Sequence, residues 1–186
     1  MSNEDQKSQY RWDPMLGEWV IYAPARNKRP FQGKKFEEEK KEEKKEKTWT
    51  CPFCPDAPEG AGEWTVKLLP NKFAALQESE FPFEPNPTTS YSKSASNAGR
   101  CNVVLYSQDH NASFGTLDHD NIVKLIELWG DTYDEIAENE GIKYPFMMEN
   151  RGAEIGCSMT HPRGQIYSFP ILPTKISRKF NAFKNN

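Results

Sequence analysis

The stretch that decides the fold is Glu149-Asn150-Arg151-Gly152-Ala153-Glu154-Ile155-Gly156-Cys157-Ser158-Met159-Thr160-His161-Pro162-Arg163-Gly164-Gln165-Ile166-Tyr167. It predicts a strand, a tight loop and a second strand. Three glycines lie where a backbone must turn or approach a ligand closely, namely Gly152, Gly156 and Gly164. Polar side chains lie between them or directly after the last one, namely Ser158, His161, Arg163 and Gln165. Such a loop can cradle a phosphate group.

The segments around this loop predict an antiparallel sheet. Residues 143–150 predict the strand that enters the loop, and residues 165–170 alternate polar and apolar side chains as the paired strand should. Residues 100–107 are a further strand candidate because of their β-branched content. Residues 10–22 predict a Pro/Gly turn followed by one short strand.

Residues 117–141 predict the one clear helix of the chain. Asp118 is a suitable N-cap and Gly141 a suitable terminator. The apolar residues recur at intervals of four and three and predict one stripe that packs on a sheet, namely Ile122, Ile126, Trp129, Tyr133 and Ile136. His119, in the first turn, is predicted to be exposed and without function. The strands and this long amphipathic helix together predict an α+β fold.

The remaining segments set the predicted domain limits. Residues 1–9 are polar and predicted to be disordered, residues 10–173 form the domain, and residues 174–186 form a basic tail without a partner strand. Within the domain, residues 34–47 contain one apolar residue and otherwise only Lys and Glu, so they are predicted to be a solvated linker. Residues 78–99 are rich in Pro, Ser, Thr and Asn and are predicted to be a mobile loop.

Length and charge exclude several classes of protein. With 186 residues the chain can form one full hydrophobic core. A net charge of −3 gives no electrostatic case for binding nucleic acid or an anionic membrane surface. No apolar run approaches the about 20 residues of a membrane span, and the first residues lack the apolar core of a signal peptide. We therefore expect a cytoplasmic protein.

The close cysteine pair in Cys51-Pro52-Phe53-Cys54 is more typical of metal ligation than of a disulfide in a reducing compartment. By itself such a pair is compatible with a metal or a redox role. A thioredoxin-type redox site needs a helix that begins at the first cysteine, and nearby helix breakers prevent one here, namely Pro55, Pro58 and Gly60. A metal knuckle is therefore the better local interpretation.

The first stretch contains an Asn-x-Gly, a Gly-Cys-Ser and a His-Pro-x-Gly-Gln in this order. In this it resembles the active-site segment of the galactose-1-phosphate uridylyltransferase family, a branch of the histidine triad superfamily. The resemblance covers the first of the two similar halves of the family's subunits. It implies a histidine-triad-like antiparallel sheet with a zinc knuckle. It also implies galactose metabolism, with nucleotidyl transfer from a UDP-sugar to a hexose 1-phosphate through a uridylyl-histidine.

The resemblance implies two sites. The family's zinc ligands match Cys51, Cys54, His110 and His161, and four protein ligands would make the site structural. The nucleotide-binding positions match Arg26, Arg29, Asn71, Phe73, Asn150, Gly156, Cys157, Ser158 and Gln165. In the family the Asn-x-Phe element lines the uridine pocket, while the Gly-Cys-Ser segment and the glutamine meet the phosphates. Cys157 has an alternative interpretation as a reactive thiol.

The sequence departs from the family at the catalytic position. The family has His-Pro-His-Gly-Gln, and its second histidine attacks the α-phosphate, whereas this chain has Arg163, whose guanidinium offers no lone pair. One interpretation is a uridylyltransferase that needs another chain for the missing half. Another is a catalytically silent, zinc-stabilised binder of a UDP-sugar, in which Arg163 holds the phosphate.

Two further expectations concern partners. A zinc-knuckle module for nucleic acid is a third interpretation, which the acidic net charge and the wide spacing of His110 and His161 disfavour. A half domain without its counterpart would expose apolar surface, and such surface tends to be covered by association. The sequence therefore predicts a homodimer.

Overall fold

The computed structural model describes residues 7–24, 26, 51–87, 89, 91–155, 157 and 159–185. The expectations for residues 1–6, Arg29, the tract 34–47, Gly156 and Ser158 lie outside the described residues. Within the described part of the chain, no helix is both long and apolar enough to cross a membrane.

The main sheet has four antiparallel strands in the order β3-β6-β8-β7. Their bounds are Lys67–Pro70 (β3), Arg100–Leu105 (β6), Tyr144–Met148 (β7) and Arg163–Phe169 (β8). The predicted pairing around the first stretch is confirmed, because β7 pairs with β8. The predicted tight loop between them is wrong. The connection spans residues 149–162 and includes the 3-10 helix Ala153–Ile155 (η5), so it is too long to be a tight loop.

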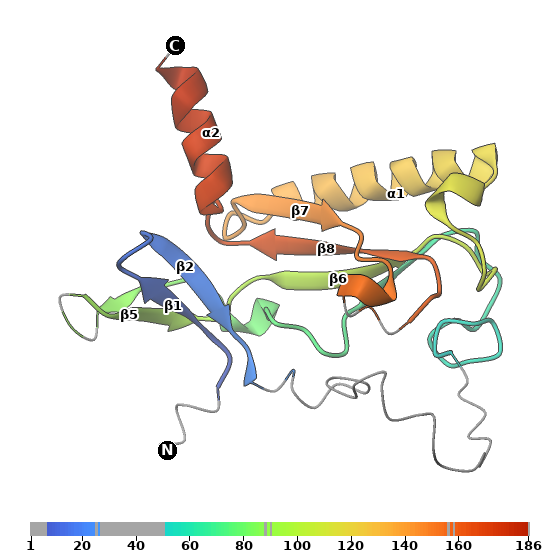
Figure 1. Cartoon of the computed structure of the whole chain (residues 1–186), viewed down its shortest axis with the longest axis horizontal. Coiled ribbons are helices and arrows are strands. Elements are labelled where there is room, and N and C mark those ends of the chain that lie inside the picture. Colours follow the sequence, from blue (N-terminus) through green and yellow to red (C-terminus); the bar gives the residue numbers. More distant parts are fainter. Residues whose placement is uncertain are drawn as a thin grey trace.

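A second antiparallel sheet has the strand order β2-β1-β5-β4, and Figure 1 labels its strands β1, β2 and β5. Its strands are Gln9–Asp13 (β1), Glu18–Tyr22 (β2), Asn86–Pro87 (β4) and Lys93–Ser96 (β5). The prediction of a single strand in residues 10–22 is wrong, because β1 and β2 form a hairpin whose turn ends at Gly17 with φ 65°.

The predicted mobile loop 78–99 is also wrong, since it contains β4 and β5 as well as the 3-10 helix Glu78–Glu80 (η3). Strand β5 has the sequence Lys-Ser-Ala-Ser, which has no β-branched residue and little intrinsic preference for a strand. It becomes a strand because its backbone pairs with β1, where Ala95 lies opposite Tyr10. This partner is distant in the sequence, so no local signal announces the strand.

Helix α1 (His119–Ala137) follows the 3-10 helix Phe114–Thr116 (η4) and begins as predicted, because the Asp118 side chain accepts a hydrogen bond from the backbone N–H of Asn121 at 2.7 Å. It ends four residues before the predicted terminator. The predicted stripe is partly wrong, since Ile126 and Tyr133 are 56% and 49% exposed. The residues of α1 that are fully buried are Leu125, Thr132 and Ile136.

The buried face contains the apolar Leu125, which the predicted stripe omitted, and also one polar residue, Thr132. The Thr132 hydroxyl donates to the carbonyl oxygen of Leu128 at 2.6 Å, so its polar group is satisfied within the helix and can be buried. A prediction that uses only apolar residues leaves Thr132 out of the buried face. The predicted face is therefore turned toward the solvent side of the helix.

A second helix, α2 (Thr174–Lys184), occupies the segment that was predicted to be a basic tail. The expectation of only one clear helix is therefore wrong. None of the α2 residues is buried. Figure 1 shows α2 standing away from both sheets at the C-terminal end of the chain.

Strand β6 contributes to three apolar clusters and so fixes the layers. Val104 packs with the buried residues of α1 on one face of the main sheet. On the other face, Cys101 packs with the second sheet and Val103 packs with the Cys51–Cys54 segment. Because alternate residues of a strand share a face, the second sheet and the cysteine segment lie on the same side of the main sheet, opposite α1.

Candidate functional site

Four side chains that could ligate one metal ion meet beside the main sheet. Their ligand atoms lie within 4.8 Å of one another and belong to Cys51, Cys54, His110 and His161. The Sγ atom of Cys54 is 3.3 Å from Nδ1 of His110 and 3.8 Å from Nδ1 of His161. These residues come from three separate segments of the chain. The structure thus brings together all four residues that the sequence predicts as metal ligands; we call them the Cys/His group.

The second nitrogen of each histidine in this group is held by a neighbour. His110 Nε2 is 2.7 Å from the Thr160 hydroxyl, and His161 Nε2 donates to the carbonyl oxygen of Ser107 at 2.9 Å. A neutral imidazole that donates from Nε2 has its lone pair on Nδ1, so the Nδ1 of His161 faces Cys54 ready to ligate. Sequence reasoning missed Thr160 and Ser107. The sequence did contain a signal for them, because Ser107 ends the strand predicted over residues 100–107 and Thr160 directly precedes the predicted ligand His161.

The cysteine segment forms successive turns. Cys54 N donates to the carbonyl of Cys51, Ala57 N to that of Cys54, and Gly60 N to that of Ala57. Gly60 is required there, because a Cβ at this position would collide with the backbone carbonyls of Cys54 and Phe53. The Trp64 indole closes the segment by donating to the Gly60 carbonyl at 2.7 Å.

The donor atoms of the Cys/His group suit a metal, and binding an ion would change the protonation of the group. Burial lowers the pKa of His161, while the Ser107 carbonyl raises it and His110 lowers it further. Burial and the neighbouring Cys51 thiol raise the pKa of Cys54 to about 11, so an ion that binds must displace this proton. Two thiols and two imidazoles within reach of one point fit the donor set of a tetrahedral zinc site.

Arg163, the first residue of β8, lies beside the Cys/His group and faces its own loop. Its Nη1 donates to the carbonyl oxygens of Met159 at 2.8 Å and His161 at 3.1 Å. Its Nη2 donates to the Sγ of Cys157 at 3.2 Å. The guanidinium carbon lies 5.6 Å from the centroid of the Phe53 ring. Arg163 thus joins the loop before β8 to the cysteine segment.

The other described loop residues are also held by protein groups. The Cys157 thiol donates to the carbonyl of Asn150 at 3.1 Å, and Cys157 N donates to the carbonyl of Gly152. Gly152 has φ 103°, the left-handed conformation that the predicted turn needs. Gly164 has a different reason to be glycine, because a Cβ there would collide with the Tyr106 hydroxyl. The group that comes close to the Gly164 backbone is therefore a side chain of the protein, whereas the sequence analysis considered a ligand.

Several residues predicted at the nucleotide lie close together on the same face of the main sheet. Arg26 Nη1 donates to the carbonyl of Phe73 at 2.7 Å and to the Tyr167 hydroxyl at 3.1 Å. Asn71 Oδ1 accepts from Phe73 N at 2.9 Å and closes the turn after β3. Gln165 shares its face of β8 with Tyr167, two residues further on. Sequence reasoning missed Tyr167, although this alternation was visible.

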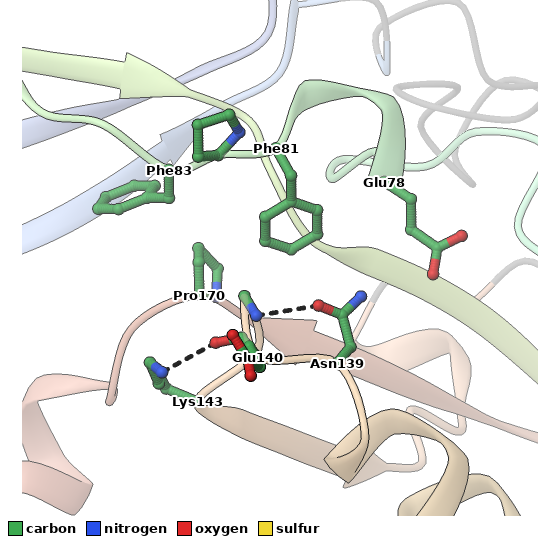
Figure 2. Close-up of a pocket in the computed structure, with 9 residues that line it drawn as sticks. Glu78, Phe81, Phe83, Asn139, Glu140, Lys143 and Pro170 are labelled. Carbon is green, nitrogen blue, oxygen red and sulfur yellow. Dashed lines mark hydrogen bonds between the residues drawn. The ribbon is translucent and has the colours of Figure 1, made fainter.

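Two cavities lie elsewhere. One, of about 620 Å³, opens between the segment before β4 and the turn from α1 to β7, and Figure 2 shows that its polar groups bond to one another. Asn139 Oδ1 accepts from Gly141 N at 2.9 Å, and Lys143 Nζ donates to the carbonyl of Glu140 at 2.8 Å. The other, of about 500 Å³, includes Asn71 in its wall. Neither is lined by the Cys/His group.

Residues 1–173 match the family model for the N-terminal domain of galactose-1-phosphate uridyl transferase. The chain belongs to this family. It is 34% identical over 174 residues to the galactose-1-phosphate uridylyltransferase of Thermotoga maritima, covering 94% of this chain and 50% of the relative. It is also 27% identical over 195 residues to the ADP-glucose phosphorylase of Arabidopsis thaliana, covering 99% of this chain and 55% of the relative.

Solved structures agree with this membership of the uridyl transferase family. A uridylyltransferase structure has a TM-score of 0.72 at 27% identity and covers 94% of this chain and 50% of its own. An Arabidopsis ADP-glucose phosphorylase with bound ADP-glucose shares the fold, with a TM-score of 0.60. The relatives of this chain are enzymes, and the chain spans about half the length of the curated relatives that it matches.

Proposed function

We propose that this family member binds a UDP-sugar on the face of the main sheet that carries Gln165 and Tyr167, and that it forms no covalent uridylyl intermediate by itself. The observation that carries the proposal is Arg163. It occupies the position at which the family's nucleophilic histidine is expected, and it donates three hydrogen bonds to its own loop. A protonated guanidinium has no lone pair with which to attack phosphorus.

The sequence offers no replacement nucleophile of the same kind. It contains three histidines. Two of them, His110 and His161, direct Nδ1 at Cys54. The third, His119, is 88% exposed in the first turn of α1, which packs on the opposite face of the main sheet. A two-step transfer through a uridylyl-histidine therefore lacks its nucleophile in this chain.

The proposed nucleotide site combines two groups of residues. The nucleoside end would contact Arg26, Arg29, Asn71 and Phe73. The phosphates would contact Asn150, Gly156, Cys157, Ser158 and Gln165. Support comes from the hydrogen bonds of Arg26 to Phe73 and Tyr167, because Tyr167 shares its face of β8 with Gln165.

The proposed cofactor is one zinc ion held by Cys51, Cys54, His110 and His161. An ion with four protein ligands has no open position for a water or a substrate, so it would supply structural cross-linking and no Lewis-acid step. Residues around the ion would orient its ligands and support the adjoining loop. The hydrogen bonds of Thr160 and Ser107 orient the two imidazoles, and Arg163 holds the adjoining loop in place.

A second candidate function is uridylyl transfer to a hexose 1-phosphate with help from another chain. The observation that favours it is length, because about half of each curated relative has no counterpart here. Residues that hold the hexose phosphate and complete the reaction would then correspond to the half of the relatives that this chain does not match.

The test combines binding with covalent chemistry. We expect calorimetry to detect UDP-glucose binding to the purified chain, with ADP-glucose as the comparison ligand, since the relatives include an ADP-glucose phosphorylase. Intact-mass spectrometry after incubation with UDP-glucose should show no uridylyl adduct. Arg163→His should form the adduct, and Arg163→Met, which lacks an imidazole, should not.

Three outcomes would contradict this proposal. A stoichiometric adduct on the unchanged chain would mean that another residue is the nucleophile. Absence of any heat with both sugar nucleotides would remove the binding function. If Arg163→His binds UDP-glucose yet forms no adduct, Arg163 is not the residue that prevents the transfer, and the second candidate becomes the better one.

A further inference from the structure

Tyr167 is a buried tyrosine whose hydroxyl bonds to two protein groups. The side chain is 8% exposed, which leaves little surface for a ligand. Its hydroxyl oxygen accepts from Arg26 Nη1 at 3.1 Å, so the hydroxyl proton is available for the hydrogen bond to the Cys101 thiol. Cys101 is also buried, at 5% exposed. The Tyr167 hydroxyl is therefore placed to hold neighbouring residues.

The contacts of Tyr167 form part of a closed hydrogen-bond network. Arg26 Nη1 donates to the carbonyl of Phe73 at 2.7 Å as well as to Tyr167. Phe73 N donates to Asn71 Oδ1 at 2.9 Å, and Asn71 N donates to the carbonyl of Cys101 at 3.0 Å. The Cys101 thiol completes the path back to Tyr167. We call Arg26, Asn71, Phe73, Cys101 and Tyr167 the five-residue network.

The five-residue network fixes the turn after β3 to the main sheet. Cys101 and Tyr167 lie opposite each other on the paired strands β6 and β8, whereas Arg26 follows β2 of the second sheet. Moving the turn away from the main sheet would break two bonds at once, one at the Phe73 carbonyl and one at Asn71 N. Phe73 is 40% exposed, so part of its side chain remains accessible to a ligand.

We propose that Tyr167 is a positioning residue for the nucleoside end of a bound sugar nucleotide. It acts through Arg26, which ties the Phe73 carbonyl to β8. This inference rests on the proposed function, because it adds a buried supporting residue to the nucleoside site proposed above. A turn that is already held loses less conformational freedom when a ligand binds, and this raises the affinity.

Tyr10 provides a matched control in the same apolar cluster. Tyr10 and Tyr167 are both buried and pack in one cluster with Cys101. Among the described residues, the Tyr10 hydroxyl has no hydrogen-bond partner. A change of either tyrosine to phenylalanine removes one hydroxyl oxygen from this cluster. Only the change at Tyr167 breaks the five-residue network.

The experiment measures the binding of UDP-glucose and of UMP to the full chain by calorimetry. Tyr167→Phe should weaken both by about fivefold, which corresponds to about 1 kcal/mol, the net contribution of one hydrogen bond. The factor should be the same for both ligands, because UMP keeps the nucleoside end and lacks the hexose. Tyr10→Phe should change either Kd by less than about twofold.

Three further measurements separate positioning from general stability. Amide hydrogen exchange without ligand should be faster for residues 71–74 in Tyr167→Phe and unchanged there in Tyr10→Phe. Cys101→Ser keeps an acceptor for the Tyr167 hydroxyl, so it should retain more affinity than Cys101→Ala. In a double-mutant cycle, Arg26→Met combined with Tyr167→Phe should lose less affinity than the sum of the two single changes, since both break the same path.

The outcomes distinguish this inference from the proposed function. If the unchanged chain binds neither UDP-glucose nor UMP, the proposed function fails and the positioning role fails with it. If the unchanged chain and Tyr167→Phe bind both ligands equally well, the positioning role is wrong and the proposed function stands. Equal losses in Tyr10→Phe and Tyr167→Phe would overturn the inference by assigning the effect to packing of the cluster. A loss for UDP-glucose without one for UMP would overturn it by placing the effect at the hexose end.

Discussion

The Cys/His group and the loop around Arg163 share the residues His161-Pro162-Arg163 and use them in opposite ways. At His161 the ring is held by the Ser107 carbonyl from behind, which leaves Nδ1 directed at Cys54. At Arg163 three N–H donors are used by loop carbonyls and a thiol of the protein itself. The arrangement at His161 keeps a ligand atom available for a metal. The arrangement at Arg163 uses three N–H donors within the protein.

If Arg163 occupies the family's catalytic position, as proposed, a residue that cross-links its own loop stands where a reactive one is expected. The face of the main sheet that carries Gln165 lies beside several of the residues expected to bind a nucleotide, such as Arg26 and Phe73. The side chain expected to react is replaced by one that cross-links the loop. If zinc is bound as proposed, the C-terminal part of the loop before β8 is held twice, by the ion at His161 and by the guanidinium two residues later.

The largest expected effect comes from removing one ligand. Cys54→Ser should abolish stoichiometric zinc and reduce stability by about 4 kcal/mol, the contribution of an ion present at about 1,000 times its Kd. For a chain of this size that corresponds to a decrease in Tm of about 8–16 °C. Metal analysis and thermal unfolding with and without a chelator measure both. Cys157→Ser, outside the Cys/His group, should retain zinc. An unchanged Tm in Cys54→Ser would refute a structural ion.

A smaller effect is expected at Arg163. Arg163→Met removes three hydrogen bonds and leaves the Met159 and His161 carbonyls without these donors, at a cost of about 2–3 kcal/mol. Urea unfolding should show this loss while zinc content is unchanged. Arg163→Lys keeps the charge but not the planar fork, so it should recover only part of the loss. Equal stability of all three proteins would mean that Arg163 does not hold the loop.

The hydrogen bond that orients His110 provides a finer test of the proposed zinc site. Thr160→Val keeps the shape of the side chain but removes the hydroxyl beside His110 Nε2, and loss of such an outer partner lowers metal affinity by about tenfold. Competition with a zinc-sensitive dye measures the Kd. Thr65→Val makes the same chemical change at a residue bonded to Lys124 instead, and it should have no effect on zinc. Equal Kd values for both variants would contradict the role of Thr160.

The last prediction concerns pH. The raised pKa of Cys54, about 11 without an ion, keeps this thiol protonated at neutral pH, so zinc binding must release its proton. Affinity should therefore fall as pH is lowered, by about tenfold per pH unit for each thiol proton displaced. Burial lowers the pKa of His161, which therefore adds no proton release at neutral pH. Chelator competition at two pH values measures the slope, and a Kd independent of pH would argue against thiolate ligation.

Local chemistry in the sequence was sufficient for several elements. The α+β class, the pairing of β7 with β8 and the Asp118 N-cap follow from alternation, glycine placement and capping chemistry, which act over a few residues. The resemblance to the uridylyltransferase family was carried by short motifs in a fixed order, and the family match confirms it. The convergence of the Cys/His group was likewise expected from its positions in those motifs.

Tertiary structure decided what depends on partners distant in the sequence. Strand β5 has weak local preference and forms because β1 lies beside it, and the buried face of α1 includes Thr132 because Leu128 satisfies its hydroxyl. The sequence by itself determined that residue 163 is an arginine and therefore cannot be the nucleophile. Only the fold decided that its donors point to Met159, His161 and Cys157, since hydrogen-bond partners are chosen by what packing brings within about 3 Å.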